Sequence, residues 1–146
     1  MQIRTTRFGP LEVEPEDLIR FANGLPGMED CKHWVLLADA ETSALGWLQC
    51  TSRAEVALAV VSPRRFVPNY QFRVYRSELA PLELDDVKDA QVLVVVGKND
   101  RAITLNLKAP VVINLQRRLG RQVVANGDQP LCYELAHTPA PLKKSA

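Results

Sequence analysis

Short apolar runs separated by proline and glycine constrain this chain more than any other feature of its sequence. Ten prolines and seven glycines divide 146 residues, so few stretches are long enough for a helix of several turns. Strand character is clear in 33–38 (HWVLLA), 46–50 (GWLQC), 56–62 (VALAVVS) and 92–96 (VLVVV). Short turns between successive strands argue against βαβ crossovers, and barrel closure removes exposed edges. We therefore expect a mainly β fold, a small antiparallel β-barrel with one or two short helices.

Local signals add further elements to this barrel. Segments 2–8 and 11–14 flank Gly9-Pro10 and predict a first hairpin, and 15–21 predicts one helical turn with proline near its start. Segment 71–75 alternates like a strand, and 77–90 is the best helical stretch, kept short or split by Pro81. The turn 97–100 predicts a hairpin between 92–96 and a strand from Ala102. Gly120, within RRLGR, is expected in the left-handed conformation.

The longest strand candidate, 104–116 (TLNLKAPVVINLQ), contains a proline in its middle. Its odd positions are all apolar, and this parity continues across Pro110, which predicts one apolar face without a bulge. A strand of this length must bend around a barrel, and Pro110 marks the bend or an edge position. Leu107 is then expected to face the core, whereas Asn106, Lys108 and Asn114 are expected to face outward.

The size and composition suit one soluble domain. Apolar residues make up 47% and charged residues 24% of the chain. We expect a single barrel domain over 1–137 and a flexible tail over 138–146, which lacks apolar mass. The start of the chain has no apolar signal-peptide core, and no apolar run is long enough to span a bilayer. A cytoplasmic protein without membrane contact is expected.

Catalysis and metal binding find little support in the residue types. The three cysteines (Cys31, Cys50 and Cys132) form no CxxC pair and are expected to be buried or inert, and the two histidines are distant in sequence. No nucleophile–base set or phosphate-binding loop can be assembled. We expect no enzyme, no cofactor and no metal. Residues 1–100 carry a net charge of −4 and residues 101–146 carry +5, which gives +1 overall.

Several motifs in order resemble the flagellar assembly factor FliW family. They are QIRTTRFGPLEV near the start, FANGLPGMED (21–30), GWLQC (46–50), VVSPRRFVPNY (60–70) and NLKAPVVIN followed by RRLGRQVV (106–124). The resemblance covers about residues 2–125, and the ordered set is more specific than any one piece. It implies a non-catalytic cytoplasmic β-barrel that binds flagellin in a chaperone-like way. It also implies binding to CsrA, a dimeric RNA-binding repressor, and relief of its repression of flagellin translation.

The resemblance directs attention to residues within these motifs as partner contacts. They are Leu25, Pro26 and Met28 of the turn cluster, Asn106, Lys108, Pro110 and Asn114 of the interrupted strand, and Arg118 of the following turn. For the turn cluster, the alternative to a binding role is that it is only a tight turn. For Asn106, Lys108 and Asn114, the alternative is an ordinary solvated strand face. A monomer is expected. Because the chain is near neutral, CsrA binding is expected to be weaker or more salt-tolerant than in acidic family members.

Direct nucleic-acid binding by an OB-like barrel is the alternative function. Arg64-Arg65, Arg117-Arg118 and Lys143-Lys144 supply basic charge, and small barrels often bind single strands. Such sites also need outward aromatic side chains for base stacking. Aromatic residues are only 6% of the chain, and Trp34 and Trp47 lie in apolar runs where burial is expected. No direct nucleic-acid partner is therefore expected.

Overall fold

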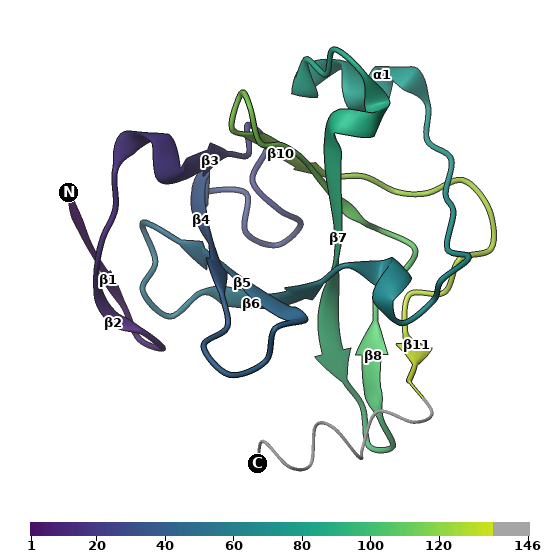
Figure 1. Cartoon of the computed structure of the whole chain (residues 1–146), viewed down its shortest axis with the longest axis horizontal. Coiled ribbons are helices and arrows are strands. Elements are labelled where there is room, and N and C mark those ends of the chain that lie inside the picture. Colours follow the sequence, from purple (N-terminus) through teal and green to yellow (C-terminus); the bar gives the residue numbers. More distant parts are fainter. Residues whose placement is uncertain (136–146) are drawn as a thin grey trace.

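A β-barrel forms the centre of the computed structural model, which describes residues 1–135 (Figure 1). The strands are hydrogen-bonded in the circular order β7-β6-β5-β4-β3-β10-β9, and β9 pairs with β7 to close the ring. All pairs are antiparallel except β10 with β3, which makes the barrel mixed. The mainly β fold and the barrel are confirmed, with this one parallel contact added. The barrel strands are β3 (Leu18–Arg20), β4 (His33–Ala38), β5 (Leu45–Cys50), β6 (Ala57–Val61), β7 (Ala90–Lys98), β9 (Val111–Asn114) and β10 (Leu119–Gln122).

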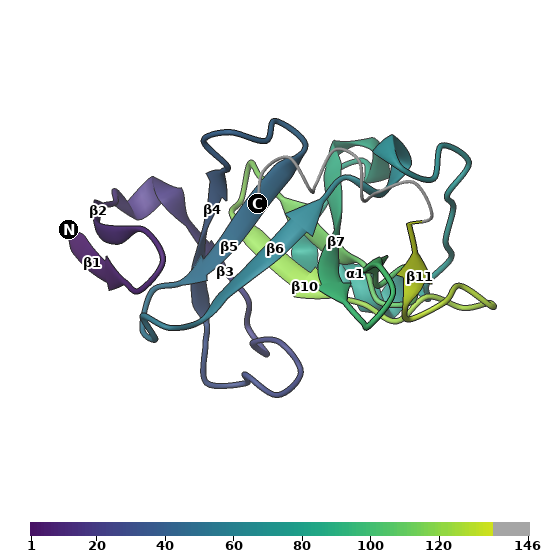
Figure 2. The ribbon, with the colours of Figure 1, turned by 90° about the horizontal axis from the view of Figure 1, so that it is seen from below.

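Smaller elements lie outside the ring. A hairpin of β1 (Gln2–Thr5) and β2 (Gly9–Glu12) lies at one end, and β8 (Ile103–Leu105) with β11 (Tyr133–Glu134) lies at the other end (Figures 1 and 2). The first hairpin and the turn after it are confirmed. The helical elements are η1 (Pro15–Asp17), η2 (Pro63–Arg65), α1 (Arg76–Leu79), η3 (Ala80–Leu82) and η4 (Val87–Asp89).

Two expected elements differ from the structure. The helix predicted over 77–90 is divided into α1, η3 and η4, because Pro81 cannot continue an α-helix and Glu83 takes a left-handed φ of 53°. The strand predicted over 71–75 is reduced to a single bridge between Arg73 and Asn126. Both segments instead form an irregular layer over the outside of β7 and β9.

The barrel interior is filled by one apolar cluster, called here the inner cluster. Close packing explains Gly120, which was expected in a left-handed conformation but lies within β10 without a positive φ. A Cβ there would lie 2.4 Å from the Phe21 ring, so only glycine lets β10 pass this ring. The buried members of the inner cluster are Ile19, Phe21, Leu25, Cys31, Trp34, Leu48, Cys50, Val60, Leu93, Val111 and Ile113.

Two further clusters cover the outside of β7 to β9. The first, which includes Val94, Leu105 and Leu107, is covered by the segment around Tyr70. The second includes Val112 and packs under Leu82. The outer face of these strands is therefore a second core rather than a solvated surface, and the irregular layer of residues 66–84 is what covers it.

The interruption between β8 and β9 changes which face is apolar. Leu105 is opposite Val96, and Val111 is opposite Leu93. The chain therefore advances six residues in this segment while the paired strand β7 advances only three. Opposed residues share a face, and β7 residues three apart point to opposite faces. Leu105 and Val111 consequently face opposite sides. The expectation of unbroken parity across Pro110 is wrong, because the chain leaves the ladder at 106–110 and re-enters it reversed.

Candidate partner-binding surfaces

The turn cluster after β3 is built on glycines with positive φ. Gly24 has φ 61°, and a Cβ at this position would lie 2.5 Å from the Met28 carbonyl oxygen. The Met28 N–H donates to the Leu25 carbonyl at 2.7 Å, which closes the turn. Leu25 is 1% exposed and belongs to the inner cluster, Met28 packs against that cluster, and Pro26 is exposed. Of the three predicted contact residues here, Pro26 has the exposed side chain.

The interruption at 106–110 is held by side-chain hydrogen bonds and by backbone hydrogen bonds to neighbouring segments, outside the strands β8 and β9. The Asn106 Oδ1 accepts from the Lys108 and Ala109 N–H groups at 3.2 and 3.0 Å, an Asx turn. The Lys108 Nζ donates to the Gly127 carbonyl. Asn106 and Lys108 are both partly exposed. Pro110 is buried, and its carbonyl accepts from the Val123 N–H at 3.0 Å. Asn106 and Lys108 therefore have structural roles and remain accessible in part.

Asn114 is placed differently from the prediction. It does lie on the outer face of β9, opposite to Ile113, but it is only 3% exposed. Its Nδ2 donates to the Leu82 carbonyl at 2.9 Å, and its Oδ1 accepts from the N–H groups of Gln116 and Arg117 at 3.1 and 3.2 Å. The expectation that Asn114 faces solvent is wrong, because η3 covers this face.

Arg118 supplies the left-handed residue of the turn before β10. Its φ is 56°, and its Nη2 donates to the Asp17 carbonyl at 2.9 Å. This contact lies beside the parallel pairing of β10 with β3, so Arg118 helps to fix the step that makes the barrel mixed. Its side chain is partly exposed. A partner-binding role for the eight residues predicted from the sequence stays a prediction.

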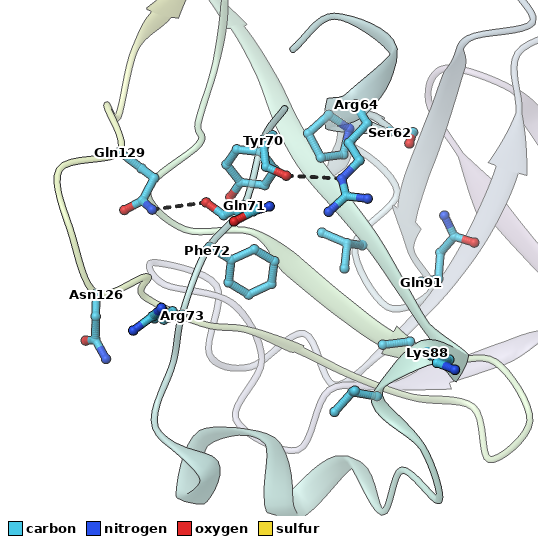
Figure 3. Close-up of a pocket in the computed structure, with 14 residues that line it drawn as sticks. Ser62, Arg64, Tyr70, Gln71, Phe72, Arg73, Lys88, Gln91, Asn126 and Gln129 are labelled. Carbon is cyan, nitrogen blue, oxygen red and sulfur yellow. Dashed lines mark hydrogen bonds between the residues drawn. The ribbon is translucent and has the colours of Figure 1, made fainter. Parts of the chain in front are cut away.

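A pocket that the sequence analysis did not single out lies at the edge of β7 (Figure 3). Its volume is about 800 Å³, and none of the eight predicted residues lines it. Its walls come from η2, the segment around Phe72, the start of β7, and the loop that contains Asn126. A sequence signal was present, because residues 63–76 contain four arginines, four aromatics and no acidic residue. We call this feature the β7-edge pocket.

Tyr70 fixes one wall of the β7-edge pocket. Its hydroxyl donates to the Leu107 carbonyl at 2.7 Å, and its ring stacks on Phe72 with centroids 5.8 Å apart. Burial raises the pKa of Tyr70 to about 12, so the phenol stays neutral at physiological pH. Tyr70 therefore joins the pocket to the interruption at 106–110 and offers no ionisable group to a ligand.

Basic residues of 101–146 form ion pairs with acidic residues of 1–100. Arg117 pairs with Glu83 at 3.2 Å, and Arg121 with Glu78 at 3.7 Å. These contacts join the basic last third to acids of residues 1–100, so the uneven distribution along the sequence does not create a single basic face. Four acidic residues at the end of the β1–β2 hairpin and directly after it are all exposed: Glu12, Glu14, Glu16 and Asp17.

The described residues give no sign of a reaction centre. Residues 1–135 contain no group of three or more metal-ligating side chains. Cys31 and Cys50 are buried, and burial together with the Cys50 side chain raises the pKa of Cys31 to about 11, which leaves an unreactive thiol. Cys132 is exposed, whereas His137 and the predicted tail lie outside the described residues. No helix in the described part is long and apolar enough to cross a membrane.

The aromatic side chains are divided between the core and the surface. Trp34 is fully buried, as expected; Phe21 is also fully buried, and the two rings meet edge to face at 6.2 Å. Trp47 is partly buried, and Arg7 lies over its ring at 4.1 Å. Tyr75 and Phe66 are 70% and 39% exposed. The two tryptophans are therefore not free platforms for base stacking.

Comparison with known proteins gives a consistent result. The family model described as FliW protein matches residues 2–136. Flagellar assembly factor FliW of Thermoanaerobacter pseudethanolicus is 35% identical over 132 residues, covering 88% of each chain. The protein of the same name from Desulfitobacterium hafniense is 36% identical, covering 94% of this chain and 90% of the relative. A crystal structure of the flagellar assembly factor FliW matches with a TM-score of 0.85 and 30% identity, covering 92% of this chain and 96% of that one.

Proposed function

The chain belongs to the FliW family of flagellar assembly factors, which are not enzymes, and we propose that it binds flagellin and CsrA in the cytoplasm. In this proposal it holds flagellin in a chaperone-like way and relieves CsrA repression of flagellin translation, as a monomer. The observation that carries the proposal is the family match over residues 2–136, which spans every described strand of the barrel.

Exposed apolar side chains support the flagellin part of the proposal. Tyr75 and Val124 each lie two residues from the isolated bridge between Arg73 and Asn126. These two side chains are 70% and 62% exposed, which is high for large apolar residues. An amphipathic helix from near the flagellin chain termini could lay its apolar face here. Tyr75 and Val124 are therefore added to the proposed flagellin contact.

The CsrA part of the proposal retains the accessible members of the predicted set. Pro26 is exposed, and Met28, Asn106, Lys108 and Arg118 are partly exposed. Asn114, Pro110 and Leu25 are buried and would act only by holding their neighbours in place. Since the net charge is +1, we expect the association rate with CsrA to change little with ionic strength.

Calorimetry with purified flagellin and purified CsrA tests both parts separately. We expect a measurable heat and co-elution on a sizing column for each partner at micromolar concentration. Tyr75→Ala is expected to weaken flagellin binding, and Lys108→Ala to weaken CsrA binding. Lys98→Ala, an exposed lysine in β7, is the matched control and should change neither. Absence of binding to both partners would contradict the proposal.

Stopped-flow measurement at two ionic strengths tests the electrostatic expectation. A rate that changes little agrees with the near-neutral surface. A fast rate that collapses with added salt would show that exposed acids of residues 1–100 make the contact instead, and the cluster at residues 12–17 would be the first to substitute. This result would correct the contact surface without changing the partner.

A further inference from the structure

The β7-edge pocket contains a strand edge that the barrel leaves open. β6 pairs with β7 only at Val60↔Val95 and Val61↔Val94. The next position of β6 that would face Val92 is Pro63, which has no N–H and starts η2 instead. On its other edge, β7 is paired to β9 from Ala90 to Leu93. The first residues of β7 are therefore hydrogen-bonded to β9 on one edge, whereas β6 does not pair with them on the other edge.

The hydrogen-bond alternation shows which groups face this open edge. The Asn106 N–H donates to the Val95 carbonyl at 3.0 Å, so the backbone groups of Val95 point toward the β8 and β9 edge. Successive residues of an antiparallel strand alternate in this direction. The N–H and C=O of Val92 consequently point toward the edge where β6 has ended. In the described part of the chain, β6 offers them no partner.

The pocket surrounds this edge rather than lying on one face of the sheet. Gln91 and Val92 both line it, although neighbouring residues of a strand point to opposite faces. A cavity can contact both side chains only where it opens around the strand edge. Figure 3 agrees, with Gln91 on the side of β7 away from Phe72. The volume of about 800 Å³ lies in the range of ~300–1,000 Å³ typical of ligand pockets.

The charge of the lining is of one sign. Arg64, Arg73 and Lys88 line the pocket, and no acidic residue does. Among residues 1–135, none of these three cations takes part in an ion pair. The Arg64 Nε donates to the Tyr70 carbonyl at 3.1 Å, which holds the guanidinium over the pocket with its terminal nitrogens directed inward (Figure 3). Such a guanidinium can bind a carboxylate in a bidentate manner.

The remaining lining favours a peptide over a free polyanion. Apolar side chains of Phe72, Val92 and Val87 face the cavity beside the cations. A strand that adds to a sheet edge places alternate side chains on opposite sides, so it can present an apolar side chain to one wall and a carboxylate to the other. A phosphate chain would use the cations but neither the apolar wall nor the Val92 backbone groups.

We propose that the β7-edge pocket binds an extended acidic peptide segment, which adds as a short antiparallel strand along β7 at Val92 while its carboxylates pair with Arg64 and Lys88. The bound segment would lie beside β7 in the position that β6 would occupy if it continued past Pro63. The proposal does not depend on flagellin or CsrA, because it follows from the open strand edge and the uncompensated cations. It identifies the partner by its chemistry, as a protein segment with alternating acidic and β-branched residues.

A fluorescein-labelled peptide of alternating glutamate and valine, with blocked ends, is the probe. Fluorescence anisotropy should show saturable binding to the full chain below about 1 mM. The same peptide with lysine in place of glutamate should not bind. Arg64→Ala and Lys88→Ala are each expected to weaken binding about tenfold, as for a lost charge-assisted hydrogen bond. Lys98→Ala is the matched control, and unchanged melting temperatures show that each variant is folded.

Amide hydrogen exchange distinguishes strand addition from simple charge attraction. Exchange of the Val92 amide should slow when the peptide is bound, because its N–H gains a partner. Binding that responds to Arg64→Ala without protection of Val92 would show an anion site only and would overturn the strand-addition proposal. Equal competition by inorganic polyphosphate or by single-stranded DNA, again without protection at Val92, would also overturn it. No saturable peptide binding would overturn it completely.

Discussion

Replacing Asn114 by alanine should destabilise the fold strongly, although the sequence places this residue on a polar-edged strand. The side chain is 3% exposed and makes hydrogen bonds in two directions. Its Nδ2 donates to the carbonyls of Leu82 and Glu83 at 2.9 and 3.3 Å, and its Oδ1 accepts from two N–H groups of the turn before β10. Asn114 therefore fastens η3 to the barrel and also closes the turn.

The magnitude follows from which groups lose their partners. Leu82 is 1% exposed, so its carbonyl cannot exchange Asn114 for water and bears a desolvation cost of about 1–3 kcal/mol. Gln116 and Arg117 are exposed, so their N–H groups can bond to water, and the loss there is about 0.5–1.5 kcal/mol in total. We expect Asn114→Ala to lower the free energy of unfolding by about 1.5–4.5 kcal/mol.

Urea unfolding followed by circular dichroism measures this loss. Gln116→Ala is the control, because its exposed side chain should cost under about 0.5 kcal/mol. Asn114→Asp is a second test variant. It keeps the accepting oxygen but replaces the donating NH₂ with a carboxylate oxygen, which is repelled by the two carbonyl oxygens. The folded-state pKa of the new carboxyl should be raised above its ordinary value of about 4, so the stability of this variant should recover as the pH falls toward 4 and the recovery should be complete below that pH. A loss below about 1 kcal/mol for Asn114→Ala, with an unchanged denaturant slope, would refute the buried-amide account.

Three other substitutions test the packing. Leu107→Ala should cost about 2–5 kcal/mol in urea unfolding, because Leu107 is 3% exposed in an outer cluster; a cost near zero would show that the irregular layer is loosely packed. Gly120→Ala should cost about 1–3 kcal/mol, because the new Cβ would lie 2.4 Å from the Phe21 ring; a double-mutant cycle with Phe21→Leu should be strongly non-additive, and additivity would argue against this contact. Tyr70→Phe should lower the melting temperature at neutral pH through loss of the hydrogen bond to Leu107. Since the folded pKa of Tyr70, about 12, lies above its ordinary value of 10.0, this stabilising contribution is complete below pH 10 and is lost as the pH rises toward 12; a difference between variant and wild type that stays constant over this range would contradict the assignment.

Strand positions were the most predictable part of the structure. The run HWVLLA is β4 without change, and VLVVV lies inside β7. Period-two patterns and turn residues act locally, and for that reason one sequence is enough to place these strands. The positive φ of Gly24 and Gly27 was also predictable, because side chains restrict that conformation.

Features that depend on distant segments were not predictable in the same way. Parity put Asn114 on the face opposite to Ile113, which is right, but it could not show that residues 80–84 cover that face. Likewise, Gly120 is required by Phe21, which is far away in sequence. The face reversal at 106–110 depends on register with β7, which a single strand does not encode.

The candidate sites also divide into features that were predictable from local sequence and features that depend on the fold. Motif resemblance drew attention to the turn cluster and the interrupted strand, whose accessible members remain the proposed contacts. Two cations of the β7-edge pocket, Arg64 and Arg73, lie in the basic and aromatic stretch 63–76, but only the fold brings Lys88 and the edge of β7 to this stretch, so the pocket was missed. The proline that ends β6 was visible in the sequence, but its consequence for the edge of β7 required the topology.

Cell-free translation of a flagellin messenger RNA tests the central proposal most directly. CsrA is first added until translation is repressed, and the purified protein is then titrated into the mixture. The account predicts that translation recovers as the protein reaches the concentration of CsrA, whereas a message whose leader lacks the CsrA sites is unaffected throughout. Translation that stays repressed with the protein in excess over CsrA would contradict the account.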